Sequence, residues 1–131
     1  MSDRADWNAA LERARANAPF LARALDRQPD LAALLAAGKG EAAVDWAKAQ
    51  GQEAQVEAAL RRERLGLATA LAVADLAGAF PLARIMAELT AFADRALDRA
   101  IRAAILERTG ADSADGFVAL ALGKQGAGEL N

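Results

Sequence analysis

The sequence predicts a mainly α-helical fold: an antiparallel bundle of helices, followed by the first strand and glycine-rich loop of a truncated α+β domain. Three observations predict the helices. Alanine, the best helix former, supplies 38 of the 131 residues. Apolar residues recur at helical spacing, and all three prolines fall between predicted helices. Because aromatic residues make up only 5% of the chain and alanine buries little area, we expect closely packed helices around a thin core.

The first fifty residues predict four short helices, each bounded by a capping residue, a proline or a glycine. Ser2 is the expected N-cap of the first helix. Pro19 opens the second, and Pro29 separates the second from the third. Gly38 and Gly51 end the third and fourth. The predicted helices cover 2–16, 20–27, a short apolar stretch that begins at residue 31, and 41–50.

Two longer helices form the centre of the predicted fold. They cover about 52–77 and 81–108, and the short connection between them makes them antiparallel neighbours. Gly66 is the expected weak point of the first. Oppositely charged side chains four residues apart support both helices: Glu57 with Arg61, and Asp98 with Arg102.

A run of arginines lies on the first long helix, at Arg61, Arg62 and Arg64. Such a run is most often a solvated helix face, here supported by Glu57. It could instead form an anion site or a partner site. The sequence leaves both interpretations open.

The pattern changes after residue 110. Residues 117–122 form a short apolar run with a glycine on each side, which predicts a buried strand. A single strand leaves its backbone N–H and C=O groups without partners, and the sequence offers no second strand. We therefore expect the chain to continue into a second domain beyond Asn131.

A glycine-rich loop follows the predicted strand. Glycines let the backbone approach an anion and turn its N–H groups toward it, and a lysine adds positive charge. The spacing matches neither a P-loop nor a dinucleotide-binding fingerprint. By shape alone the loop could cradle a phosphate or form a flexible tail. Its glycines and lysine are Gly123, Lys124, Gly126 and Gly128.

The composition excludes several classes of site. The chain has no Cys and no His, so cysteine- or histidine-ligated zinc, haem and iron–sulfur sites, disulfides and histidine-based nucleophile pairs are excluded. A net charge of -2 argues against a nucleic-acid-binding domain. The most apolar stretch, 65–83, contains Asp75 and Pro81, so we expect no membrane span. The polar N-terminus is unlike a signal peptide, and we expect a cytoplasmic protein.

The C-terminal segment resembles a motif of a known enzyme family. The run FVALALGKQGAGELN at 117–131 is similar to the G-M-G-K-L-G-G-x-E-L-N stretch of the glutamine synthetase adenylyltransferase/adenylyl-removing enzymes. Upstream, 61–64, 74–78 and 88–94 resemble that family's R-R-x-x-R, D-L-x-G and E-L-T-x-x-A-D runs. The resemblance extends from about Leu60 to Asn131. Ala121 and Gln125 depart from it, since the family often has Gly and Leu there.

The resemblance implies a bifunctional enzyme with two nucleotidyltransferase domains. The N-terminal domain removes AMP from a tyrosine of glutamine synthetase by phosphorolysis, and the C-terminal domain adds AMP from ATP, which regulates nitrogen assimilation. The implied partners are glutamine synthetase and a PII-type nitrogen regulatory protein. The implied cofactors are Mg²⁺ with ATP, ADP or phosphate. Carried over residue by residue, the implied nucleotide- and phosphate-binding positions are Gly123, Lys124, Gly126, Gly128 and Glu129.

The resemblance places the catalytic residues outside this sequence. The family's S-D-x-D strand, which holds Mg²⁺, is expected just beyond Asn131. Residues 1–110 would then be a helical region and 117–131 the start of a nucleotidyltransferase domain. We expect no catalytic or metal-binding residue within 1–131, and no activity from these residues by themselves. Met1 fits the N-terminal, AMP-removing half.

Two other functions stay open from the residues themselves. The helices could form an interaction module that binds a protein partner and has no active site. The glycine loop could also belong to a nucleotidyltransferase that acts on another acceptor. The codons that follow Asn131 separate the first alternative from the enzyme, and an assay on glutamine synthetase separates the second.

Overall fold

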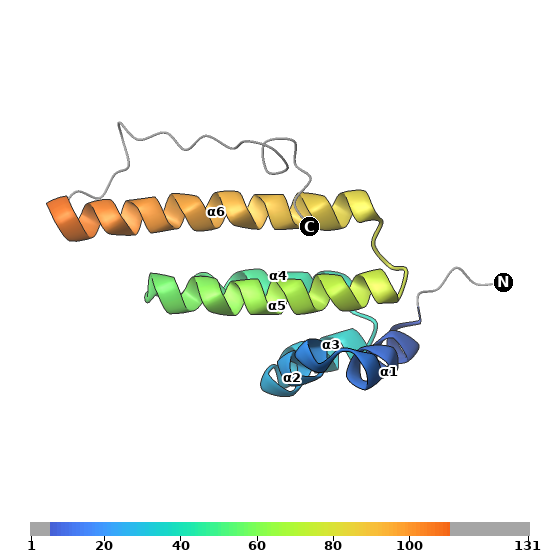
Figure 1. Ribbon diagram of the computed structural model, residues 1–131. Coiled ribbons are helices and arrows are strands. Elements are labelled where there is room, and N and C mark those ends of the chain that lie inside the picture. Colours follow the sequence, from blue (N-terminus) through green and yellow to red (C-terminus); the bar gives the residue numbers. More distant parts are fainter. Residues whose placement is uncertain (1–5, 111–131) are drawn as a thin grey trace.

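The computed structural model describes residues 6–110, and this part of the chain contains six α-helices (Figure 1). The mainly helical fold is therefore confirmed for these residues. The predicted strand at 117–122 and the glycine loop lie outside the described residues. The helices are α1 Trp7–Asn17, α2 Pro19–Arg27, α3 Pro29–Ala36, α4 Gly40–Gln50, α5 Val56–Leu76 and α6 Leu82–Thr109.

The first helix begins later than the sequence predicts. Asp6 is the N-cap of α1, with backbone angles of φ -96° and ψ 86°, and its carboxylate accepts a hydrogen bond from the Ala9 N–H at 2.9 Å. The prediction of Ser2 as the N-cap is wrong, because the aspartate next to Trp7 caps the first turn by binding one of its free N–H groups. Ser2 itself lies outside the described residues.

The helix α5 also begins later, at Val56 rather than near Gln52. Two arginine side chains, one from α5 and one from α6, bind the loop that precedes α5. The Arg99 guanidinium donates to the Glu53 carbonyl at 3.2 Å, and the Glu53 carboxylate forms an ion pair with Arg62 at 2.5 Å. These contacts hold the loop between α4 and α5 in a non-helical path.

The centre of the described fold is α5, which contacts each of the other five helices. Figure 1 shows it between α6 on one side and α1–α3 on the other, with α4 alongside. Most of its length is covered, and the buried apolar residues of neighbouring helices pack against it. Its buried residues are Ala59, Glu63, Gly66, Leu67, Thr69, Ala70, Leu71, Val73 and Ala74.

Gly66 lies where α4 packs closely on α5, so it is more than a weak point of the helix. A Cβ atom on Gly66 would lie 3.0 Å from the Ala47 Cβ and 3.3 Å from the Ala47 Cα. It would also lie 3.2 Å from the Gln28 side-chain oxygen. The missing side chain therefore permits a closer crossing, which offsets part of the helix propensity that glycine loses.

The buried polar groups near this crossing are paired. The Gln28 amide donates to the Ala24 carbonyl at 3.0 Å and to the Thr69 hydroxyl at 3.3 Å. The Thr69 hydroxyl donates to the Leu65 carbonyl at 2.7 Å. Because unpaired polar groups are costly in a core, this chain of bonds lets Gln28 bridge α2 and α5 without that cost.

The helix α6 runs antiparallel to α5, as the short connection predicts, and continues past the start of α5 (Figure 1). Between residues 82 and 108 only Ile85 is buried. Leu82, Leu97 and Leu106 are 63%, 42% and 50% exposed. One helix of the described bundle therefore leaves much of its apolar surface uncovered. None of the described helices has the length and hydropathy that crossing a membrane requires.

Candidate functional site

The pair formed by α5 and α6 has two sides, and α4 covers one of them. On this covered side the Glu63 carboxylate, which is 5% exposed, forms an ion pair with Arg95 of α6 at 2.7 Å. Gly51, at the end of α4, lies directly against this carboxylate, and a Cβ atom there would overlap Glu63. A buried carboxylate needs a counter-charge, so Arg95 fixes α6 against α5 at this point.

A second set of charges joins α4 to α6 on the same side. Arg84 donates two hydrogen bonds to the Glu41 carboxylate, at 2.8 and 2.9 Å, and Lys48 pairs with Glu88 at 2.9 Å. The Arg84 guanidinium also lies 4.5 Å from the centre of the Phe80 ring. The hydrogen bond from Arg84 holds the pKa of Glu41 below its ordinary value. The same hydrogen bond raises the pKa of Arg84.

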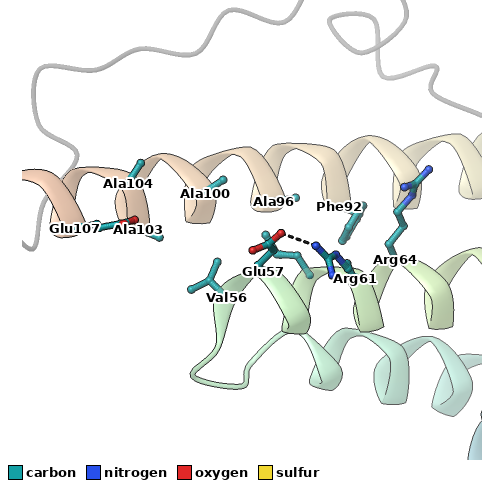
Figure 2. A pocket seen from close by; sticks show the side chains of 11 residues that line it. Val56, Glu57, Arg61, Arg64, Phe92, Ala96, Ala100, Ala103, Ala104 and Glu107 are labelled. Atoms are coloured by element: carbon teal, nitrogen blue, oxygen red, sulfur yellow. Dashed lines mark hydrogen bonds and ion pairs between the residues drawn. The ribbon is translucent and has the colours of Figure 1, made fainter.

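The other side of the pair is open. Hollows of about 520 and 380 Å³ follow it between α5 and α6, a third of about 340 Å³ lies between α2 and α5, and Arg64 lines all three. We call this side the open groove: its walls are residues 56–75 of α5 and 85–107 of α6, and Phe20 of α2 lies at its edge. Figure 2 shows the largest hollow, with side chains of α5 and α6 facing each other.

The open groove is largely apolar. Leu60 of α5 and Phe92 of α6 line it, together with Leu89 further along. Toward the C-terminal end of α6, most of the α6 residues that line the groove have small side chains, among them Ala96 and Ala100 (Figure 2). Because alanine reaches only one carbon from the backbone, the space between the helices stays unfilled there.

The structure separates the three arginines that the sequence grouped together. Arg61 pairs with Glu57 at 2.5 Å on an exposed surface, as predicted (Figure 2). Arg62 points to Glu53, away from the open groove. The Arg64 guanidinium lines the groove and has no ion pair or hydrogen bond to any other residue between 6 and 110. Arg64 therefore fits the partner-site interpretation best.

The site residues that the sequence predicts, Gly123, Lys124, Gly126, Gly128 and Glu129, all lie outside the described residues. Within 6–110, no three Asp, Glu, His or Cys side chains come together as ligands of a metal ion. The phosphate-binding prediction stays a prediction.

The buried ion pair and the open groove are not evident from the sequence. Glu63 was hidden inside an arginine-rich run that is typical of a solvated face. A signal existed, because Glu63 lies four residues after Ala59 and three before Gly66, on the same small-residue stripe of the helix. The pairing of Arg95 with this residue depends on how two helices pack, which no local pattern contains.

Comparison with known proteins identifies the family. A family model described as glutamate-ammonia ligase adenylyltransferase matches residues 8–131, nearly the whole chain. The chain belongs to the glutamate-ammonia ligase adenylyltransferase family. The match also corrects the sequence analysis, in which the resemblance began only at about Leu60: the first four helices belong to the matched region as well.

Several relatives within this adenylyltransferase family share one name. Proteins called bifunctional glutamine synthetase adenylyltransferase/adenylyl-removing enzyme in Xanthobacter autotrophicus, Rhodopseudomonas palustris and Bradyrhizobium diazoefficiens are 42%, 33% and 32% identical to this chain. The matches cover 63%, 70% and 89% of this chain, but only 10%, 10% and 13% of the relatives. The chain thus spans about a tenth of their length. No solved structure matches it.

Proposed function

We propose that this chain is the N-terminal part of an enzyme that removes AMP from a tyrosine of glutamine synthetase by phosphorolysis. A second nucleotidyltransferase domain, later in the same polypeptide, would add AMP from ATP. The observation that carries the proposal is the family match over residues 8–131, which includes both the helical region and the glycine loop. The relatives' names describe both activities.

The glycine loop is the proposed nucleotide contact. Gly123, Gly126 and Gly128 would let the backbone N–H groups approach a phosphate, and Lys124 would add a positive charge. Glu129 belongs to the same motif, where it would favour the start of a helix. When bound, Mg²⁺ would neutralise charge on the transferred group. By resemblance to the family's S-D-x-D strand, we place the metal carboxylates beyond Asn131.

The helical region is the proposed support of this loop. The helix α6 ends at Thr109, and its C-cap Gly110 has a left-handed φ of 71° and donates its N–H to the Leu106 carbonyl at 2.9 Å. The predicted strand begins seven residues later. The ion pairs of the covered side fix α6, so they would also fix where the nucleotidyltransferase domain begins. The proposed partners are glutamine synthetase and a PII-type regulator, and the proposed location is the cytoplasm.

The test is phosphorolysis by the protein from the complete reading frame. Adenylylated glutamine synthetase, phosphate and Mg²⁺ are mixed with that protein, and ADP formation is measured. We expect ADP to form. The Lys124→Met variant should form it at least about 10-fold more slowly, because the bound phosphate loses the positive charge of the Lys124 side chain. Lys39→Met changes an exposed lysine between α3 and α4 and is the matched control.

The other outcomes decide between the alternatives. Activity only on a different acceptor would favour another nucleotidyltransferase. A reading frame that stops after Asn131, with a partner bound by the helices, would favour the interaction module, which the open groove supports. Phosphorolysis by the 131 residues alone would contradict our placement of the catalytic carboxylates beyond Asn131.

A further inference from the structure

We propose that the open groove is the docking site of one amphipathic helix from a later part of the same polypeptide, with a carboxylate of that helix against Arg64. This inference rests on the proposed function to the extent that it requires a longer polypeptide. It does not require any particular reaction.

The covered side shows what fills such a groove. On that side α4 packs on α5, with Ala47 close to Gly66, and reaches α6 through the Glu41–Arg84 and Lys48–Glu88 ion pairs. Among residues 6–110 no helix occupies the other side. The lining of the open groove repeats at helical spacing on both walls, as at 60, 64, 67 and 71 of α5 and at 85, 89, 92 and 96 of α6. A helix laid along these stripes would have apolar contacts on both walls.

The dimensions of the groove also fit a helix. The wall from Ile85 to Glu107 rises through 22 residue steps of α6, or about 33 Å at 1.5 Å per residue, which a helix of about six turns would cover. The alanines at 96 and 100 allow the close backbone approach that two packed helices need. Exposed Leu97 lies on the neighbouring surface of α6 and could be covered at the rim.

The charges specify the occupant. Arg64 lies in the middle of the groove with no carboxylate partner among the described residues. Asp75 lines one end and Glu107 lines the other, and Glu57 and Arg61, which also line the groove, neutralise each other as an ion pair. The complementary helix is therefore apolar on one face, with an Asp or Glu near its centre and Lys or Arg toward its ends. Covering Arg64 without such a carboxylate would bury an unpaired charge.

The position of the chain favours an occupant from the same polypeptide. The described part ends at Gly110, only three residues after Glu107, so the chain leaves α6 at the mouth of the groove. The chain spans about a tenth of its relatives' length. A helix on the continuing chain would have a high effective concentration at the groove, which a separate protein would lack.

Hydrogen exchange tests the docking. Exchange is measured in the 131-residue chain and in the protein from the complete reading frame, at the backbone amides of 56–64 and 96–108. We expect these amides to exchange at least about 10-fold more slowly in the longer protein, because a docked helix suppresses local opening. The Ala100→Arg variant of the longer protein should lose this protection. Ala87→Arg should keep it, because both alanines are exposed on α6 but only Ala100 lines the groove.

Reversal of the charge tests the carboxylate. Arg64→Glu in the longer protein should also lose protection, whereas Arg64→Met should lose less. Circular dichroism of each variant verifies that it folds, and the same variants of the 131-residue chain should melt like the parent. Equal exchange in the short and the long protein would overturn the proposal.

Further outcomes separate other occupants and other failures. Protection that appears only when glutamine synthetase is added, or that grows with protein concentration, would overturn the proposal in favour of a separate partner or a second copy. The phosphorolysis assay is run on the same samples. Activity without protection refutes this inference alone, and protection without activity refutes the proposed reaction alone.

Discussion

The two sides of the α5–α6 pair differ in how their charges are used. On the covered side, Glu63 is buried and Arg95 neutralises it at 2.7 Å. On the open side, Arg64 has no partner among the described residues and faces apolar walls. Burial and an opposite charge nearby therefore mark the charged residues that hold the described helices together. Position within an arginine-rich run does not mark them.

The largest expected effect is the loss of stability when Arg95 on the covered side is replaced, compared with the replacement of Arg64 on the open side. Arg95→Met should destabilise the 131-residue chain by about 2 kcal/mol, because Glu63 is left buried without a counter-charge and Arg95 itself is partly exposed. Arg64→Met should change stability by less than about 0.5 kcal/mol. Urea unfolding at pH 7 measures both.

A matched control excludes a general effect of losing an arginine from α6. Arg102 pairs with Asp98, and both side chains are more than half exposed. Arg102→Met should therefore cost less than about 0.5 kcal/mol. Equal losses in Arg95→Met and Arg102→Met would show that the Glu63 pair contributes nothing special.

A smaller effect is expected from filling the space beside Glu63. Gly51→Ala places a Cβ atom where the buried carboxylate lies, so either the end of α4 or the ion pair must shift. We expect a loss of about 1–2 kcal/mol in the free energy of unfolding. The test is a double-mutant cycle with Glu63→Ala. If the two losses simply add, the overlap does not cause the effect.

The smallest expected effect is the pH dependence that Glu41 contributes. Arg84 lowers the pKa of Glu41 in the folded state from its ordinary value of 4.5. This stabilisation is present above pH 4.5 and is lost as the pH falls through the lowered value. Because Glu41 is largely exposed, we expect less than about 0.5 kcal/mol.

The measurement compares Glu41→Gln with the parent chain at pH 7 and at pH 3. The variant should be less stable at pH 7, and the difference should shrink at pH 3. Glu12→Gln changes an exposed carboxylate with no ion pair among the described residues, and should show no such trend. A difference for Glu41→Gln that grows toward pH 3 would contradict the sign.

Much of the fold could be predicted because local signals mark its boundaries. Pro19 and Pro29 begin helices where the sequence places breaks, and Gly78, with a φ of 69°, ends the turn after α5. The prediction failed at the start of α1, where Ser2 and Asp6 are both good caps. The choice between them depends on where Trp7 packs, against the glycines at 38 and 40, and that contact is tertiary.

The candidate site was less predictable. The groove exists because two stripes of small and apolar side chains face each other without a third helix, and a sequence gives the stripes but not what covers them. The glycine loop shows the opposite case. Its motif, together with the upstream runs at 61–64, 74–78 and 88–94, pointed to the family that the match over residues 8–131 shows, although the loop lies outside the described part of the structure.

The central place of α5 has a consequence for biosynthesis. The ribosome makes α1–α4 first, yet each of them contacts α5 in the finished fold, and the carbonyl of Leu76 at the end of α5 accepts a hydrogen bond from Arg13 of α1 at 2.6 Å. The 21 residues of α5 take about 1–4 s to synthesise. During that interval, and until α5 has left the ribosome, the nascent helices expose leucines that α5 later covers, so we expect the chain to be open to chaperone binding at this stage.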